Sequence, residues 1–337
     1  MAPSTTTRPR ALFAMARHHH ELLFPPAAIR RLREHVEIDP DRVVEDFARE
    51  TALDDVEVLI TSWGCPVLDE DVLIRLPALK AVVHAAGSVK HHVTQACWDR
   101  GIAVSSAPAA NALPVAEYTV AAILFANKRV LDIAGLYRAH RAPLDWSRRF
   151  PGFGNYRRTV GVLGASLVGR RVLELLRPYD FDLVLADPHV DAAQATALGA
   201  RLVPLDELVS ASDVVSLHAP ELPETRHLMD ARRLGLMRDG ATLINTARGS
   251  LVDTAALTAE AATGRINAVI DVTEPEVLPA DSPLYSLPNV LLTPHIAGSL
   301  GGELGRITHS ALDEVERYCS ARPFAHAVHH AALATSA

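Results

Sequence analysis

Cysteine is scarce in this chain, with three residues among 337, and none of the three lies in a C-x-x-C pair. Closely spaced pairs mark redox-active thiols, and a high density of cysteines marks the disulfide frameworks of small secreted domains. Neither pattern is present. We therefore expect Cys65, Cys97 and Cys319 to be reduced thiols of a cytoplasmic protein.

An excess of positive charge is missing as well. The net charge is −7 and no basic cluster offsets it, which argues against nucleic acid or an anionic membrane as the main partner. No apolar stretch approaches the length of a membrane span, and the first ten residues lack the apolar core of a signal peptide. Hydrophobic residues make up 49% of the chain, which is enough for large cores, and the length suggests two domains.

A short histidine run, His18 to His20, is a possible metal site. It has no Cys, Asp or Glu partner at ligand spacing, so a solvated loop is favoured. We expect the protein to hold no metal ion.

The first hundred residues alternate short apolar segments with amphipathic ones, which predicts a small α/β layer domain. A helix is expected to begin at Pro25-Pro26, and Asp41 and Asp69 are expected to cap the helices that follow them. The expected strands are 11–15, 36–38, 58–60, 81–83 and 102–104.

After Pro108 the pattern changes to a long apolar helix from Val115 to Leu131, whose small residues suit a connector packed between two domains. Residues 136–158 are irregular and rich in arginine. We interpret this segment as an excursion that either reaches a partner subunit or covers the active-site cleft.

The stretch from Thr159 to Arg170 changes from strand-like to helical periodicity across Gly164. Such a turn aims backbone N–H groups and the positive end of a helix dipole at one point, which suits a pyrophosphate. A second apolar run ends at Asp187, whose carboxylate can accept hydrogen bonds from a ribose diol. The pattern predicts a dinucleotide site, and a tight turn without a ligand is the alternative.

Ser166 departs from the G-x-G-x-x-G pattern, because it stands in place of the middle glycine between Gly164 and Gly169. Either the serine strains a turn that needs the dihedral freedom of glycine, or it has ordinary helical dihedrals and its hydroxyl donates to a phosphate oxygen. We favour the second interpretation, because serine is also a good helix cap.

From residue 160 on, near-continuous apolar strands recur at helix-length intervals, which is typical of a parallel sheet covered on both faces. Ligands of such sheets bind beyond the carboxyl ends of the strands, so the polar residues there should converge. The expected strands are 160–163, 183–186, 214–217, 242–245, 268–271 and 290–292, and the polar residues are Asp187, His218, Thr246, Arg248, Asp271, Glu276 and His295.

Three of these residues make a chemically coherent set. Arg248 offers a planar fork for a carboxylate or carbonyl oxygen, with a surface ion pair as the alternative. Glu276 and His295 can form a carboxylate–imidazole pair, in which the carboxylate favours the charged imidazole and fixes its tautomer. Such a pair moves a proton between an alcohol and a carbonyl near neutral pH. For His295, a buried capping histidine is the alternative.

Several long motifs in this order resemble those of the D-isomer-specific 2-hydroxyacid dehydrogenases, the family of phosphoglycerate, glycerate and formate dehydrogenases. The similarity runs from about Val58 to Ser299, and its most specific segments are 205–208, 212–220, 245–249 (Asn-Thr-Ala-Arg-Gly) and 294–299 (Pro-His-Ile-Ala-Gly-Ser). The resemblance implies two Rossmann-like or flavodoxin-like α/β domains with parallel sheets and helices on both faces. It further implies a discontinuous substrate-binding domain (1–107 and 302–337), an NAD-binding domain (108–301) and a homodimer.

The resemblance also implies a role for each site residue. Arg248 binds the substrate, Glu276 and His295 form the acid–base dyad, and Gly87 and Ser88 bind the substrate carboxylate through their amides. Glu276 is assigned by counting five residues on from Asp271, as the family motif does. NAD is expected to contact Gly164, Ser166, Leu167, Val168, Gly169, Asp187, His218, Pro220, Thr225, Thr246, Ala247, Arg248, Asp271, His295 and Gly298.

The chain departs from the family pattern at two further places. Val277 replaces the usual proline after Glu276. The loop after Gly87 has Lys90-His91-His92 where Asp-Asn is common, and this departure leaves the substrate open. The implied activity is reversible hydride transfer between NAD(H) and a small 2-oxo or D-2-hydroxy acid. Two alternatives stay open, namely an NAD(H)-sensing protein similar to the transcriptional corepressors on this fold, and a dehydrogenase of formate-like substrates.

Overall fold

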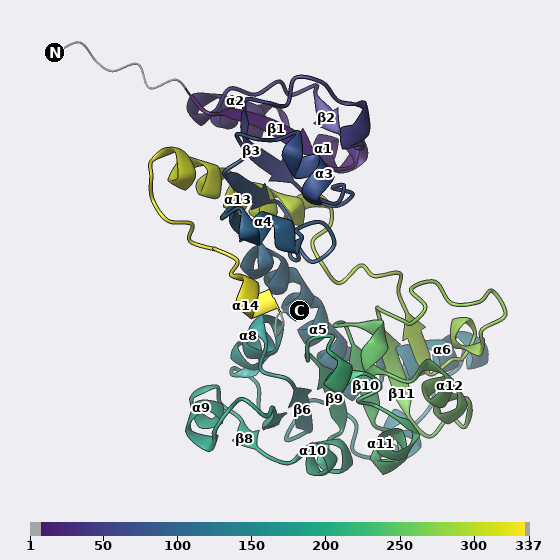
Figure 1. Ribbon diagram of the computed structural model, residues 1–337. Helices are drawn as coiled ribbons and strands as arrows, with labels where there is room; N and C mark the ends of the chain where they lie inside the picture. Colours follow the sequence, from purple (N-terminus) through teal and green to yellow (C-terminus); the bar gives the residue numbers. More distant parts are fainter. Residues whose placement is uncertain (1–7, 334–337) are drawn as a thin grey trace. The chain divides into compact units, whose positions relative to one another are not determined.

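The computed structural model describes residues 8–333 and divides into two compact units (Figure 1). The first unit comprises the chain up to Asn111 together with the chain from Ser299 on, and the second is Ala112–Gly298. These boundaries lie a few residues inside the expected domain limits at 107/108 and 301/302. The parts of the expected substrate domain at residues 1–7 and 334–337 lie outside the described residues.

The first unit is built on a five-stranded parallel sheet in the order β2-β1-β3-β4-β5. Alternate residues of a strand face opposite sides, so Phe13 and Leu12 enter two different cores. The strands are β1 (Arg10–Ala14), β2 (Val43–Val44), β3 (Val56–Thr61), β4 (Ala81–His84) and β5 (Ala103–Ser106). The first core includes helices α1 (Arg17–Leu23), α2 (Pro26–His35) and α13 (Leu304–Cys319), and the second includes α3 (Glu70–Ile74) and α4 (Gln95–Asp99).

Two local expectations in this unit are wrong. Residues 36–38 form only a single bridge, through Glu37, and the second strand lies instead at β2. Asp41 therefore precedes a strand and caps no helix, whereas Asp69 accepts a hydrogen bond from a backbone N–H at 3.0 Å and caps α3.

The histidine run lies in α1 and not in the solvated loop that its composition favours. His20 is buried, and its ring packs against Phe13 with the ring centroids 4.5 Å apart. Burial lowers the pKa of His20, so the ring contributes apolar contact to the core. Within residues 8–333, no group of three or more His, Cys, Asp or Glu side chains is arranged to hold a metal ion.

Helix α5 (Pro108–Asn127) both begins and ends earlier than the helix expected at 115–131. Arg129 has a left-handed φ of 52°, which separates α5 from α6 (Val130–His140). By length and composition alone α5 could cross a membrane, contrary to the expectation that no such stretch exists. Its residues Ala116, Val120 and Ile123 pack in a core of the second unit, as a core helix does.

The arginine-rich segment is not irregular, because it contains the end of α6 and the short helix α7 (Trp146–Arg149). None of the residues 128–159 is buried. Residues 128–159 therefore contain two helices, α6 and α7, but form no hydrophobic core of their own.

The second unit is built on a seven-stranded parallel sheet in the order β12-β11-β10-β9-β6-β7-β8. Its strands are β6 (Thr159–Leu163), β7 (Asp182–Ala186), β8 (Arg201–Leu202), β9 (Val214–Leu217), β10 (Thr242–Asn245), β11 (Asn267–Ile270) and β12 (Val290–Leu292). The sequence pattern predicts all of them except β8, a two-residue strand at the edge.

Helices cover both faces of this sheet. One core contains residues of α5, α8 (Leu167–Leu176) and α9 (Ala192–Ala197), and the other contains residues of α10 (Leu205–Ala211), α11 (Ala231–Leu236) and α12 (Thr254–Ala262). The expected fold class, two α/β domains of parallel strands with helices on both faces, is confirmed. The strand order reverses between β6 and β9, and such a switch point is where doubly wound sheets bind ligands.

Candidate active site

The turn after β6 lies at this switch point and needs both of its glycines. Gly164 has a φ of +96°, and a Cβ on it would lie 2.7 Å from the backbone nitrogen of Ala219. A Cβ on Gly169 would lie 2.0 Å from the carbonyl oxygen of Gly164. The first glycine therefore permits the turn, and the second lets α8 pack closely against it.

Ser166 begins α8 without strain, with φ −63° and ψ 179°. The expected helical dihedrals are wrong, but so is the alternative of a strained left-handed residue. Its Oγ accepts a hydrogen bond from the Gly169 N–H (3.3 Å) and caps the helix. The N–H groups of Leu167 and Val168 have no carbonyl partner within the helix, as at any helix start. This end of α8 thus offers two backbone donors and one hydroxyl to an anion.

Asp187 follows β7 and is fixed beside the same turn. Its Oδ2 accepts a hydrogen bond from the Ala165 N–H (2.7 Å), and its Oδ1 accepts one from the His189 N–H (2.7 Å). Each carboxylate oxygen keeps a lone pair for a further donor such as a hydroxyl. Arg170, for which no sequence pattern indicates a role, reaches the turn as well and donates through Nε to the Ala165 carbonyl (2.8 Å).

His218 follows β9 and is buried beneath the glycine turn. A Cβ on Gly169 would lie 3.2 Å from the His218 Cβ. Burial lowers the pKa of His218 to about 3, so the ring is neutral near neutral pH. Its Nε2 lies 2.8 Å from the Ser216 hydroxyl, and its Nδ1 is buried without a partner among the described residues. The buried ring therefore lies next to the glycine turn and supports it.

Two threonines expected at the cofactor site have hydroxyls that already contact protein groups. The Thr225 hydroxyl donates to the Pro220 carbonyl (2.6 Å) and so closes the loop after β9. The Thr246 hydroxyl lies 2.9 Å from that of Thr119 on α5. The latter contact ties the end of β10 to the helix that covers it, and no sequence pattern indicated it.

Asn245, at the end of β10, shapes the loop that carries Arg248. Its side chain donates to the Arg248 carbonyl (2.8 Å) and accepts from the Ala247 N–H (3.1 Å). The guanidinium donates to the Ala247 carbonyl (2.7 Å) and forms no ion pair with a carboxylate of the described residues. The alternative of a surface ion pair therefore does not describe Arg248, and most of its donors stay available to a ligand.

Gly249 brings the Arg248 loop into contact with the loop after β11. A Cβ on Gly249 would lie 2.1 Å from the carbonyl carbon and oxygen of Thr273 and 2.6 Å from the Glu274 nitrogen. Since these neighbours are backbone atoms, they cannot turn away. Glycine thus sets the spacing between the loop that bears Arg248 and the loop that leads to Glu276.

The structure brings His295 and Glu276 together, with Nδ1 of the imidazole 2.6 Å from Oε1 of the carboxylate. A carboxylate only accepts, so Nδ1 carries the proton of this contact and Nε2 is the nitrogen left for a reactant. The His295 side chain is 52% exposed and is therefore not a buried capping residue. Glu274 pairs elsewhere, because it accepts from Arg226 (2.8 Å), whose guanidinium lowers the pKa of Glu274.

Asp271 organises the loop that carries His295. Its buried carboxylate accepts hydrogen bonds from the Thr293 hydroxyl (2.6 Å) and from the N–H groups of the two residues after His295 (2.8 and 2.9 Å). Its carbonyl accepts from the His295 N–H (2.8 Å). Three of about four acceptor positions on the carboxylate are thus occupied, which leaves one for the contact with NAD that the resemblance implies for Asp271. Gly298 ends this loop and the second unit.

Gly87 and Ser88 lie in the first unit, in the loop after β4. Two buried histidines anchor that loop through one hydroxyl, since Thr61 Oγ1 lies 2.9 Å from Nδ1 of His84 and 3.4 Å from Nε2 of His92. Burial lowers the pKa of His92 to about 4 and also that of His84, so both rings are neutral near neutral pH. His92, the last residue of the Lys90-His91-His92 segment that departs from the family pattern, therefore helps to anchor this loop.

The carboxyl edge of the second sheet fits a dinucleotide. The N-terminus of α8 supplies donors for a pyrophosphate, Asp187 supplies acceptors for ribose hydroxyls, and the His295–Glu276 pair lies beyond β12 and β11 of the same sheet. Bound there, a nicotinamide dinucleotide would supply hydride chemistry. The residues present thus suit both parts of a dehydrogenase reaction, the hydride carrier and the proton carrier.

Comparison with known proteins agrees with this geometry. The family described as "D-isomer specific 2-hydroxyacid dehydrogenase, NAD binding domain" matches residues 120–297. D-3-phosphoglycerate dehydrogenase of Mycobacterium tuberculosis is 32% identical over 284 residues, which cover 81% of this chain and 51% of that protein. The chain thus spans about half the length of the curated D-3-phosphoglycerate dehydrogenases that it matches. Glyoxylate reductase of Korarchaeum cryptofilum is 29% identical over 280 residues, covering 82% of this chain and 84% of that protein.

Solved structures show the same likeness over nearly the whole chain. The TT0316 protein of Thermus thermophilus superposes with a TM-score of 0.76 at 30% identity, covering 95% of this chain and 100% of that one. D-lactate dehydrogenase of Aquifex aeolicus, solved with NAD and lactic acid, gives a TM-score of 0.72 at 27% identity, covering 93% and 96%. The matched family domain takes up more than half of the chain, and the chain belongs to the D-isomer-specific 2-hydroxyacid dehydrogenases.

Proposed function

We propose that the chain is an NAD-dependent oxidoreductase that reversibly reduces a small 2-oxo acid to its D-2-hydroxy acid. The observation that carries this proposal is the 2.6 Å contact between His295 and Glu276 on the sheet that also bears the glycine turn. A protein that only binds NAD(H) needs the turn but no proton-transferring pair. The names of the relatives, which include phosphoglycerate dehydrogenase, glyoxylate reductase and D-lactate dehydrogenase, support a small 2-oxo acid as substrate.

A nicotinamide bound at this edge of the sheet would supply the hydride that reduces C2 of the substrate. His295 holds a proton on Nε2 and donates it to the oxygen at C2, while Glu276 keeps the ring oriented through Nδ1. Arg248 holds the substrate carboxylate and polarises the carbonyl with its guanidinium donors. Gly87 and Ser88 are proposed to bind the carboxylate through their amides. The oxidation runs through the same groups in reverse, with Nε2 accepting the proton.

A panel of 2-oxo acids tests the proposal. We expect NADH to be oxidised in the presence of at least one of glyoxylate, hydroxypyruvate, pyruvate and bulkier analogues. The loss of NADH absorbance measures this oxidation. Tight NADH binding without turnover of any of them would favour an NAD(H)-sensing protein. Reduction of NAD by formate, without turnover of 2-oxo acids, would favour the formate-like alternative.

Asp187 predicts the choice of cofactor. Two negative charges about 4 Å apart repel by roughly 1 kcal/mol in water and by about 4 kcal/mol at an effective dielectric of 20, so the 2′-phosphate of NADPH is disfavoured. We expect kcat/KM to be at least about tenfold higher with NADH, since 1.4 kcal/mol is a factor of ten. Asp187→Ser should narrow this ratio, and Asp182→Ser, at the exposed start of the same strand, should leave it unchanged. Equal efficiency of the wild type with both cofactors would refute the assignment.

Ser166 predicts a loss of affinity when it is replaced by glycine. A hydrogen bond from its hydroxyl to a phosphate is charge-assisted and contributes on the order of 1.5 kcal/mol, so Ser166→Gly should weaken NADH binding by up to about tenfold. The helix itself should lose only a few tenths of a kcal/mol, because glycine is a tolerated cap. Fluorescence titration measures the Kd. Tighter binding by the glycine variant would mean that the serine is a tolerated defect.

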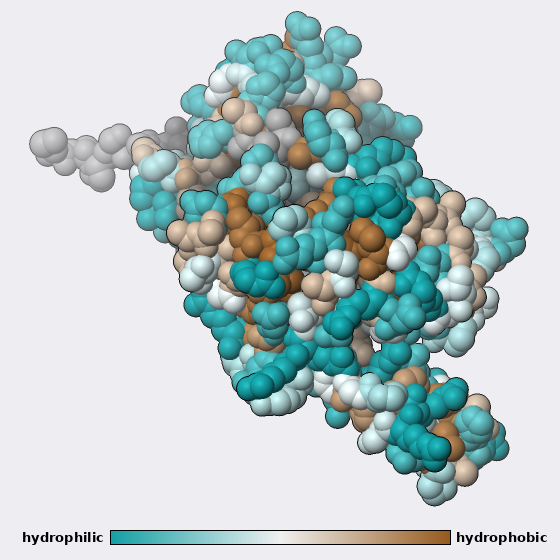
Figure 2. Space-filling model, turned by 90° about the horizontal axis from the view of Figure 1, so that it is seen from below, coloured by the Kyte–Doolittle hydropathy of each residue, from teal (hydrophilic) through white to brown (hydrophobic). Residues whose placement is uncertain are grey.

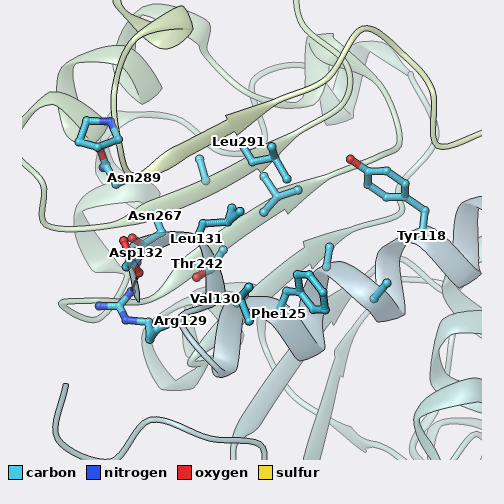
Figure 3. A pocket seen from close by; sticks show the side chains of 16 residues that line it. Tyr118, Phe125, Arg129, Val130, Leu131, Asp132, Thr242, Asn267, Asn289 and Leu291 are labelled. Atoms are coloured by element: carbon cyan, nitrogen blue, oxygen red, sulfur yellow. Dashed lines mark ion pairs between the residues drawn. The ribbon is translucent and has the colours of Figure 1, made fainter. Parts of the chain in front are cut away.

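We further propose that two copies of the chain associate through the face of α5 and α6. A groove of about 190 Å³ lies between the end of α5, the start of α6 and strands β11 and β12, lined among others by Phe125, Leu131 and Leu291 (Figure 3). Phe125 is 56% and Tyr137 59% exposed, and hydrophobic residues form patches on the face shown in Figure 2. Helices α6 and α7 contain no buried residue, and short helices without burial are marginal on their own. A second copy would supply the missing contacts.

Light scattering after gel filtration tests this association. We expect a dimer for the wild type and a monomer for Phe125→Glu, because a charge placed in the groove cannot be buried without a partner. The matched control is Ile74→Glu, since Ile74 is 69% exposed but lies in the first unit. A monomeric wild type, or dissociation by both variants, would contradict the proposal.

The free thiols Cys65, Cys97 and Cys319 support a cytoplasmic location, which we also propose. Burial raises the pKa of each thiol, so all three are protonated and unreactive near neutral pH. Fractionation of cells that produce the full-length protein tests the location.

A further inference from the structure

The loop that carries His295 is held by hydrogen bonds and not by packing. Residues 294–296 are all exposed, so little apolar burial fixes them. His295 has a left-handed φ of 55°, which a non-glycine residue keeps only when its surroundings impose it. The surroundings that do so are the acceptors of Asp271, which bind this loop at four points.

A third residue extends this network to helix α5. The hydroxyl of Tyr118 lies 3.0 Å from that of Thr293, which in turn lies 2.6 Å from Oδ1 of Asp271. The direction of the protons follows from the carboxylate. Asp271 can only accept, so Thr293 uses its single proton for Asp271, and Tyr118 must be the donor to Thr293.

The surroundings of Tyr118 suit this role as a donor. Burial raises the pKa of Tyr118, and the negative charge of Asp271 raises it further, so the hydroxyl keeps its proton near neutral pH. Tyr118 also lines the groove beside α5, and Figure 3 shows its ring extending from the helix toward the strand that carries Leu291. The residue therefore contacts the groove with its ring and the network with its hydroxyl.

We propose that Tyr118 is a positioning residue for the reaction, which holds His295 in its left-handed conformation through Thr293 and Asp271. The proposal rests on the proposed function only for its effect on turnover. Donation by Tyr118 orients the Thr293 hydroxyl toward Asp271, and Asp271 then fixes the peptide groups on both sides of the imidazole. Networks of this kind, in which each bond polarises the next, act as a unit.

Tyr118→Phe tests the proposal because it removes one hydroxyl and keeps the ring. Hydrogen–deuterium exchange of the protein without substrate is the first measurement, and we expect faster exchange of the amides of Ile296 and Ala297. Turnover is the second. We expect kcat to fall by about tenfold with the KM for NADH unchanged, since a displacement of the proton donor by a fraction of an ångström affects the reaction and not cofactor binding.

Two pairs of variants separate positioning from general damage. Thr293→Ser keeps the relaying hydroxyl and should behave as the wild type, whereas Thr293→Val should reproduce or exceed the effect of Tyr118→Phe. Tyr179→Phe removes the hydroxyl of an exposed tyrosine that lies outside both the groove and the network, and it should change neither measurement. Unchanged exchange at residues 296–297 in Tyr118→Phe would overturn the proposal, whatever the activity of the wild type. Altered exchange with an inactive wild type would uphold it and contradict the proposed function instead.

Discussion

Replacing His295 by asparagine is expected to lower kcat by about a hundredfold to ten-thousandfold, the range that a general acid–base group contributes. Asparagine is the suitable replacement, because it tolerates the left-handed region better than other residues and so keeps the φ of 55° at this position. Its amide can form hydrogen bonds but cannot exchange a proton near neutral pH. NADH binding should survive, since the turn before α8 is unchanged, and fluorescence titration of the variant checks this.

The same substitution, glutamate to glutamine, is made at residues 276 and 274 to check which glutamate belongs to the dyad with His295. Glu276→Gln removes the charge that faces Nδ1 of His295, and we expect turnover to fall by at least about tenfold, because the imidazolium loses its stabilising partner. Glu274→Gln breaks the exposed pairs with Arg226 (2.8 Å) and His227 (3.7 Å), and each such pair contributes about 1 kcal/mol or less. A larger loss of activity in Glu274→Gln than in Glu276→Gln would show that the dyad is assigned to the wrong glutamate.

The second large effect is expected at Gly249, where alanine should lower kcat/KM by at least about a hundredfold. The added Cβ would lie 2.1 Å from the backbone of Thr273, so one of the two loops must move. One of these loops bears Arg248 and the other leads to Glu276, and a misplacement of about 1 Å costs on the order of a hundredfold. Overpacking should also lower the free energy of unfolding by about 1–3 kcal/mol, which a thermal melt measures.

Gly235→Ala is the matched control for this prediction. Gly235 lies in α11, and no atom lies within 4 Å of an added Cβ. Alanine there should leave activity unchanged and stabilise the helix by about 0.5–1 kcal/mol. A Gly249→Ala variant with the activity and melting temperature of the wild type would show that the two loops are not held by their close approach.

The strands of the second sheet could be predicted from the sequence because each is a short apolar run, and burial on both faces of a parallel sheet requires such runs. The strand β8 has only two residues, which is too short for an alternating pattern to show. Residues 36–38 resemble a strand because they are apolar at alternate positions, yet only Glu37 pairs with β1. The apolar pattern of the long helix continues past Asn127, and the sequence around Arg129 gives no local sign of the left-handed φ that separates α5 from α6.

At the site, the positions of polar residues just after the apolar strands are enough to predict which side chains converge, because the carboxyl ends of parallel strands meet at one edge of the sheet. The sequence alone indicates the turn at Gly164, the candidate Asp187 and the pairing of His295 with Glu276. The contacts that hold these groups in place become visible in the folded chain alone. The acceptors of Asp271, which follows β11, are occupied by groups of the loop after β12. The close approach at Gly249 and the link from Tyr118 to Thr293 join segments that lie far apart along the chain. No local pattern encodes such contacts, since they exist only after the sheet has formed.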